Sequence, residues 1–124
     1  DNTILYTDHF LGQAIQWLKK SEATSAPALL YVSDHGESLG ENNLYLHGLP
    51  YRVAPDVQKR VPWITWWSSR FEKQSGLSRT CLKNKAAAPL THDSYFHSVL
   101  GLMSVSSEVY QAKLDVHADC RSKL

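Results

Sequence analysis

The segment "ALLYVSDHG", from Ala28 to Gly36, decides the fold, because an apolar run ends there abruptly at two polar side chains. Residues 28–33 do not alternate between apolar and polar, which is typical of a strand buried on both faces, as in a parallel sheet covered by helices. Asp34 and His35 follow directly. Because open α/β sheets bind ligands at the carboxyl ends of their strands, we expect a site at these two residues.

The segments on either side of this strand also favour an α/β fold. A helix is predicted to begin at Asn2 or Thr3, and residues 21–27 end it. Its apolar residues recur at spacings of three and four: Ile4, Leu11, Ala14, Ile15 and Leu18. A glycine- and asparagine-containing loop is predicted from Gly36 to Pro55, and loops of that length in a compact domain are usually functional or mobile.

Two further elements complete a predicted order of helix, strand, loop, strand and helix. The segment "VPWITWW", Val61–Trp67, is the second strand, and since alternate strand residues face the same side, we expect Trp63 or Trp66 in the core. After a polar stretch, Thr91 precedes a helix with one apolar face, formed by Phe96, Val99, Leu100 and Met103. The predicted fold is therefore α/β, with a mostly parallel sheet covered by helices.

Length and charge restrict the class of protein. A chain of 124 residues, 43% of them hydrophobic, can form one hydrophobic core and therefore at most one domain. Thirteen basic against twelve acidic residues leave a net charge of +1, which argues against nucleic acid as a partner. No apolar run is as long as a membrane-spanning helix, and the first residue is not methionine. We expect the chain to be a piece of a longer protein.

Cys81 and Cys120 are the two cysteines of the chain. They are too far apart for a CxxC redox pair and too few for a thiolate metal site, so a structural disulfide is the favoured interpretation. Such a bond would place the protein in an oxidising compartment and, in the chain-entropy model, add roughly 4 kcal/mol of stability for a loop of about forty residues. Two buried free thiols in a reducing compartment are the alternative.

Asp34 and His35 have the chemistry of metal ligands. A carboxylate oxygen and a neutral imidazole nitrogen both suit zinc. Adjacent residues can share one metal only if the backbone turns between them, and Gly36 makes such a turn easier. His47 would join them if the loop returns to the strand end. From residue types alone, a hydrogen-bonded loop without metal is the commoner outcome for such a pair.

The longer segment "YVSDHGESLGENNLYLHGLPY", Tyr31–Tyr51, closely resembles the signature of the bacterial phosphoethanolamine transferases that modify lipid A, a group that includes colistin-resistance enzymes of the alkaline phosphatase and sulfatase superfamily. The segments "DNTILYTDHFLGQAIQWLK", "APDVQKRVP" and "LTHDSYFHSVLGLM" resemble the same catalytic domain in the same order. The resemblance implies that residues 1–124 are the C-terminal part of a single periplasmic catalytic domain.

The resemblance also implies roles for individual residues. Asp34 and His35 match two ligands of the catalytic zinc, and His47 matches a histidine that contacts substrate phosphate or a second zinc. The implied reaction moves phosphoethanolamine from phosphatidylethanolamine to a lipid A phosphate through a threonine-bound intermediate, at the periplasmic face of the inner membrane. The nucleophilic threonine, the remaining zinc ligands and the membrane helices are expected upstream. No catalytic residue is therefore assigned within this chain, which we expect to be inactive alone.

Two other functions remain open. A phosphatase or sulfatase of the same superfamily would also use the Asp34–His35 pair. A non-catalytic module stapled by a disulfide would bind no metal. Glu37 and Glu41 are expected either to orient imidazoles or, more commonly, to accept hydrogen bonds from loop backbone, and His92 and His97 to be structural or solvated.

Overall fold

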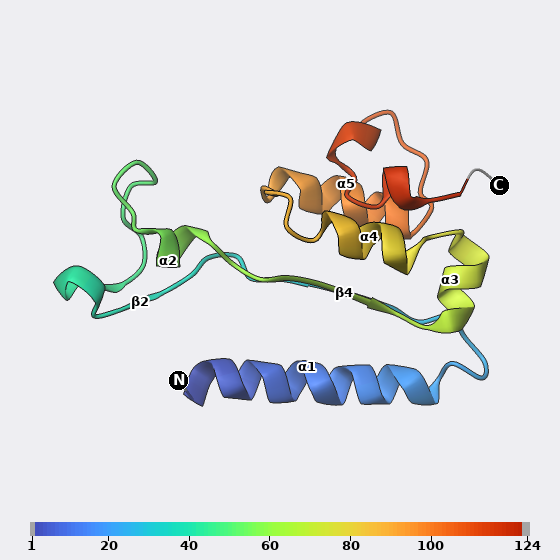
Figure 1. Cartoon of the computed structure of the whole chain (residues 1–124), viewed down its shortest axis with the longest axis horizontal. Coiled ribbons are helices and arrows are strands. Elements are labelled where there is room, and N and C mark those ends of the chain that lie inside the picture. Colours follow the sequence, from blue (N-terminus) through green and yellow to red (C-terminus); the bar gives the residue numbers. More distant parts are fainter. Residues whose placement is uncertain (1, 123–124) are drawn as a thin grey trace. The chain divides into compact units, whose positions relative to one another are not determined.

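The computed structural model describes residues 2–122 (Figure 1). Those residues form two compact units. The first contains residues up to Leu29 together with those from Trp66 onward, and the second contains residues 30–65. Helices and small sheets are both present, in agreement with the predicted α/β class.

Helix α1, Asn2–Lys20, begins and ends close to the predicted positions. Lys19 and Lys20 lie in its last turn, where positive charge interacts favourably with the helix dipole. Leu11 is the buried residue of this helix, whereas Ile4 and Trp17 are 68% and 70% exposed. The spacing of apolar residues therefore predicted the helix correctly, although most of its apolar side chains are exposed in this chain.

Strands β1, Ala28–Val32, and β4, Trp63–Trp67, form a two-stranded sheet. The Ser68 N–H donates to the Pro27 carbonyl at 3.0 Å. Since Pro27 precedes β1 and Ser68 follows β4, the two strands run antiparallel. Both predicted strands are thus present, but their mutual direction differs from that expected for neighbours in a parallel sheet.

Burial of the two strands also differs from the prediction. Every residue of β1 is half-buried, not fully enclosed. The alternation of strand residues predicted that Trp63 or Trp66 lies in the core, but both are half-buried. The buried tryptophan of β4 is Trp67, which is 4% exposed. Trp67 is enclosed locally because the Arg79 guanidinium lies over its ring and donates to its carbonyl at 3.0 Å.

Short helices follow β4 in the first unit. They are α3, Ser69–Ser75, α4, Arg79–Lys85, α5, Asp93–Leu102, and the 3-10 turns η2, Ala112–Leu114, and η3, Ala118–Cys120. Hydroxyl groups of Ser68 and Ser78 accept from backbone N–H groups three residues ahead and so cap α3 and α4. Figure 1 shows α4 and α5 beside the C-terminal turns, with which they are in contact.

The helix predicted after Thr91 is present as α5, but the residues that it buries are small or polar and are not those of the apolar face formed by Phe96 and its neighbours. Phe96 and Met103 are 51% and 69% exposed, while the buried residues are Ser94, His97, Ser98 and Gly101. The reason is the close approach of the following chain. A side chain at Gly101 would collide with the Asp115 carboxylate, and the Ser98 hydroxyl accepts from the backbone of residue 116 at 3.1 Å.

Cys81 and Cys120 form a disulfide, with Cα atoms 5.5 Å apart. The bond joins α4 to η3 across a sequence separation of 39 residues. The Ser78 N–H donates to the Cys120 carbonyl at 2.8 Å beside it. The predicted disulfide is therefore present and closes the C-terminal part of the first unit.

The second unit gives structure to the segment predicted as a long loop. Strands β2, Ser38–Leu39, and β3, Tyr45–Leu46, pair antiparallel around the 3-10 turn η1, Glu41–Asn43, and helix α2, Asp56–Lys59, follows. The Gly36 N–H donates to the carbonyl of residue 58 at 3.0 Å. A Cβ at Gly36 would collide with the carbonyl of residue 57, so this close approach requires glycine.

Among the described residues, no helix combines the length and the apolar character needed to cross a membrane.

Candidate metal centre

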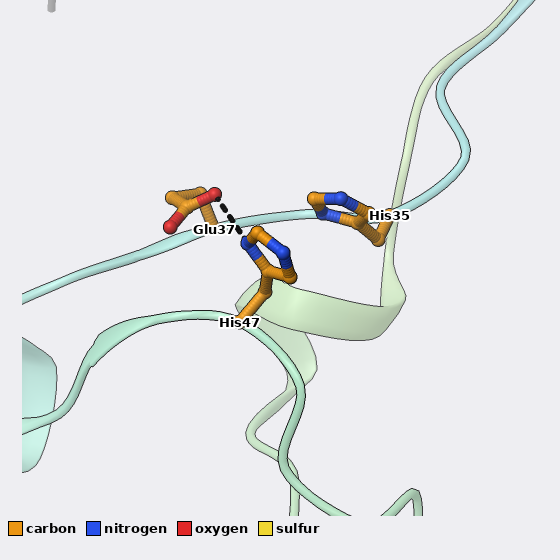
Figure 2. A group of neighbouring side chains, drawn as sticks. All are labelled: His35, Glu37 and His47. Atoms are coloured by element: carbon orange, nitrogen blue, oxygen red, sulfur yellow. Dashed lines mark hydrogen bonds and ion pairs between the residues drawn. The ribbon is translucent and has the colours of Figure 1, made fainter.

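The candidate site lies within the second unit, where the chain leaves β1 and returns after β3. His35 and Glu37 come from the outgoing segment, and His47 comes from the returning one. Figure 2 shows these three side chains pointing toward one another. One ligand atom from each lies within 4.8 Å of the others, an arrangement that no other group of histidine, cysteine and acidic side chains shows in residues 2–122.

The two imidazoles stack, with ring centroids 3.9 Å apart and planes inclined by 28°. Their side chains are 42% and 49% exposed for His35 and His47. His47 Nδ1 lies 3.1 Å from Glu37 Oε2 (Figure 2), and the Glu37 side chain is 40% exposed. The cluster is therefore accessible to a ligand from solvent.

Hydrogen bonds define which ring nitrogen of each histidine can bind a cation. His35 Nδ1 lies 2.9 Å from the Gly36 carbonyl, which can only accept, so this nitrogen carries the proton. The Glu37 carboxylate is likewise an acceptor, so His47 Nδ1 donates to it. In the neutral form, each ring therefore carries its lone pair on Nε2. This arrangement is typical of metal-ligating histidines, whose other nitrogen donates to a carbonyl or carboxylate.

Asp34 borders the cluster but is not one of the three converging residues. Its Oδ2 lies 3.8 Å from His35 Nε2, and its Oδ1 accepts from the His35 N–H at 3.1 Å. Backbone N–H groups of Asp34 and His35, followed by the His35 imidazole, lower the pKa of the Asp34 carboxyl below its usual value. The side chain is 89% exposed and ionised at neutral pH, so it can turn toward a cation held by His35.

Glu37 and Glu41 have different contacts, although the same two alternatives were predicted for both. Glu41 Oε2 accepts from the Leu39 N–H at 2.7 Å and so stabilises the turn. Glu37 instead contacts the His47 imidazole. The sequence contains one signal for this difference: in an extended segment residues two apart face the same side, which places Glu37 beside His35.

The donor set fits a zinc ion. Two imidazole nitrogens and at least one carboxylate are ligands that zinc prefers, with bonds of about 2.0–2.2 Å. Tetrahedral bonds of that length separate ligand atoms by roughly 3.4 Å, so side-chain rotations would bring the present atoms into range. The exposed rings and carboxylates have room for such rotations.

His97 and His117 lie in the first unit and take part in its packing. His97 Nδ1 accepts from the Gln111 N–H at 3.1 Å, in agreement with its predicted structural role. His117 is completely buried beside Asp115, with Nδ1 and Oδ1 3.3 Å apart. No sequence pattern predicts this buried pair, because it depends on the contact of the C-terminal turns with α4 and α5.

This α/β chain, with its histidine and carboxylate cluster after a strand, belongs to the sulfatase family, whose profile matches residues 1–105. Enzymes of this family depend on a metal.

Within that family, the chain is similar to phosphoethanolamine transferases. It is 43% identical over 122 residues to EptA of Escherichia coli K12, an alignment that covers 98% of this chain and 22% of that protein. It is 42% identical over 108 residues to the phosphatidylethanolamine transferase Mcr-1 of Escherichia coli, covering 87% of this chain and 18% of that protein. The chain therefore spans about a fifth of the length of these relatives.

A solved structure extends the similarity to the fold. The soluble domain of lipooligosaccharide phosphoethanolamine transferase A from Neisseria meningitidis matches with a TM-score of 0.92 and 44% identity, covering 98% of this chain and 37% of that domain. The resemblance to phosphoethanolamine transferases and the sulfatase-like α/β fold, both predicted from the sequence, are thus confirmed.

Proposed function

We propose that this chain is the C-terminal part of the periplasmic catalytic domain of a zinc-dependent phosphoethanolamine transferase, which moves phosphoethanolamine from phosphatidylethanolamine to a lipid A phosphate. The observation that carries the proposal is the convergence of His35, Glu37 and His47 beside Asp34, in a chain 43% identical to EptA. The remaining zinc ligands, the nucleophilic threonine and the membrane-spanning helices would lie in other parts of the protein.

Asp34 and His35 would hold the catalytic zinc. The ionised carboxylate supplies negative charge, and His35 supplies Nε2 because its Nδ1–H is engaged by the Gly36 carbonyl. When bound, zinc lowers the pKa of a nucleophilic hydroxyl and neutralises charge that develops on phosphoryl oxygens.

His47 would face the substrate phosphate or a second zinc. The Glu37 carboxylate accepts from its Nδ1–H and so fixes the tautomer and orientation of the ring. His47 Nε2 is then free to accept a proton or, when protonated, to donate one to a phosphate oxygen. The exposed position of both side chains leaves room for a lipid headgroup.

The 124-residue chain alone should not catalyse the transfer. It contributes Asp34 and His35 but no assigned nucleophile, so a zinc ion bound to it would remain largely solvated. We expect weak zinc binding by the isolated chain. A submicromolar dissociation constant in a calorimetric zinc titration would contradict this expectation.

The Cys81–Cys120 disulfide supports the proposed location. Disulfides persist in oxidising compartments such as the bacterial periplasm. A position at the periplasmic face of the inner membrane would bring the site to both lipid substrates. The net charge of +1 gives no reason to propose a nucleic acid as a partner.

The proposal is tested by lipid A analysis in cells that express the intact protein containing this chain. The host should lack its own phosphoethanolamine transferases, and mass spectrometry should detect the added group on lipid A. We expect His35→Ala to lower the amount of modified lipid A more than about 100-fold. Losing a residue that only hydrogen-bonds to a metal ligand typically lowers activity about 10–100-fold, and losing the ligand itself should lower it further. His9→Ala, on the exposed surface of α1, is the control and should retain activity. Full activity of His35→Ala would refute the ligand assignment.

A second candidate function is hydrolysis of a phosphate or sulfate ester. The match of residues 1–105 to the sulfatase family favours it. The intact protein should then release p-nitrophenol from its phosphate or sulfate ester and leave lipid A unmodified. Modified lipid A would instead favour the transferase.

A further inference from the structure

One buried side chain connects the segments that carry the candidate ligands. Gln58, in α2, is 7% exposed, and its Nε2 donates to Ser38 Oγ at 2.8 Å and to the Leu46 carbonyl at 3.1 Å. Ser38 is itself 1% exposed. Both protons of the amide are therefore used inside the second unit.

Each partner of Gln58 is a sequence neighbour of a candidate ligand. Ser38 follows Glu37, and Leu46 precedes His47. The backbone carbonyl of Gln58 also accepts from the Gly36 N–H at 3.0 Å, and Gly36 lies between His35 and Glu37. Three bonds to one residue thus fix both the outgoing and the returning segments.

The backbone at Leu46 adds a reason for such a restraint. Its φ of 65° is in the left-handed region, which a residue with a branched side chain rarely adopts. Such conformations persist where the surroundings hold them, and they cluster at functional sites. The bond from Gln58 to the Leu46 carbonyl holds this peptide, which directly precedes His47.

We propose that Gln58 is a positioning residue that holds His35 and the Glu37–His47 pair beside it in the arrangement that the proposed zinc site requires. The inference rests on the proposed zinc function. Glutamine suits the task because its amide offers two neutral donors to two acceptors at the required reach. Methionine has nearly the same length and shape but no donor, so Gln58→Met removes both bonds with little change in volume.

The experiment measures zinc affinity and thermal unfolding of the intact protein, prepared free of metal and titrated with zinc alone against a competing chelator. We expect Gln58→Met to weaken zinc binding about 10-fold or more, which is the typical effect of losing a residue that orients metal ligands without touching the metal. Gln74→Met, the same change at an exposed position of α3, is the matched control and should bind zinc as the unaltered protein does. Ser38→Ala removes one acceptor and should weaken binding to a smaller extent.

A purely structural role would lower the unfolding temperature of Gln58→Met but leave its zinc affinity unchanged well below that temperature. That result would overturn the inference while leaving the proposed function intact. If Gln58→Met does not fold, Ser38→Ala decides in its place, and unchanged zinc affinity of folded Ser38→Ala overturns the inference. If the unaltered protein binds no zinc, the proposed function fails and the inference fails with it.

Discussion

His47 and His117 each lie beside a carboxylate, but their surroundings are opposite. His47 Nδ1 is 3.1 Å from Glu37 in the second unit, with both side chains at least 40% exposed. His117 Nδ1 is 3.3 Å from Asp115 in the first unit, where the two side chains are 0% and 1% exposed. The same two chemical groups, an imidazole and a carboxylate, therefore form an accessible candidate site in one unit and a packing element in the other. Accessibility and converging neighbours, more than residue type, separate the two roles.

The bonds around each pair show how this difference arises. Asp115 accepts from the His117 N–H at 2.8 Å and from the Tyr110 hydroxyl at 2.8 Å, so its oxygens are used internally. Burial raises the pKa of Asp115, but the His117 side chain and N–H and the Tyr110 hydroxyl outweigh it and leave the pKa below its ordinary value. Burial, followed by the bond to Asp115, raises the pKa of Tyr110. Its phenol therefore stays neutral at physiological pH.

Removing the disulfide should have the largest effect on stability and should act through the first unit. The double change Cys81→Ser and Cys120→Ser is expected to cost about 4 kcal/mol, from the entropy of a closed loop of 39 residues. Denaturant unfolding of the intact protein, compared with a Ser122→Ala control, measures this cost. An equal stability of the double variant and the control would contradict a stabilising role for the bond.

Asp115→Asn should destabilise the first unit by about 3 kcal/mol, because it breaks a buried charged network. The lowered pKa also predicts a pH dependence. The contribution of Asp115 is present above its unfolded pKa of about 3.9 and is lost as the pH falls through the lower folded value. The difference in unfolding temperature between the unaltered protein and Asp115→Asn should therefore shrink below about pH 4. A difference that is the same at pH 3 and pH 7 would contradict this account.

Gly36→Ala tests the second unit without changing a candidate ligand. The new Cβ would collide with the carbonyl of Val57, which should displace α2 at a cost of about 1–3 kcal/mol. Zinc affinity should fall as well, because Gly36 separates His35 from Glu37. Gly12→Ala is the control, since a Cβ there meets open space. Unchanged stability and zinc affinity in Gly36→Ala would show that this close approach is unimportant.

Glu37→Gln should have the smallest effect and tests the exposed pair alone. The amide keeps the shape of the side chain but removes the charge that supports the His47 Nδ1–H, so zinc affinity should fall by about 10-fold. Unfolding temperature should change little, because the pair is exposed. The corresponding change Glu41→Gln, at the residue that bonds to Leu39, should leave zinc affinity unaltered. An equal loss in both variants would remove the distinction between the two glutamates.

The sequence predicted those features that depend on local pattern or on an unambiguous choice. Apolar spacing predicted α1, the apolar run predicted β1, and a single pair of cysteines left one possible internal disulfide. The polar residues after β1 predicted a site at Asp34 and His35, and the structure brings His35 together with Glu37 and His47 there. These signals are carried by adjacent residues or by composition.

Features that depend on how distant segments meet could not be predicted. The buried face of α5 is formed by small and polar residues because Asp115 and the backbone after it approach closely, which no periodicity reveals. The contacts of Glu37 and Gln58 require the return of the chain at His47. The antiparallel direction of β1 and β4 likewise depends on the path of residues 33–62.

The zinc content of the intact protein, isolated without chelators and measured by inductively coupled plasma mass spectrometry, tests whether the second unit is part of a zinc site. We expect at least one zinc per molecule, lost in Asp34→Ala and His35→Ala and retained in His117→Ala provided that this variant folds. An absence of stoichiometric zinc in the unaltered protein, or its full retention in His35→Ala, would contradict the assignment of the second unit as part of a zinc site.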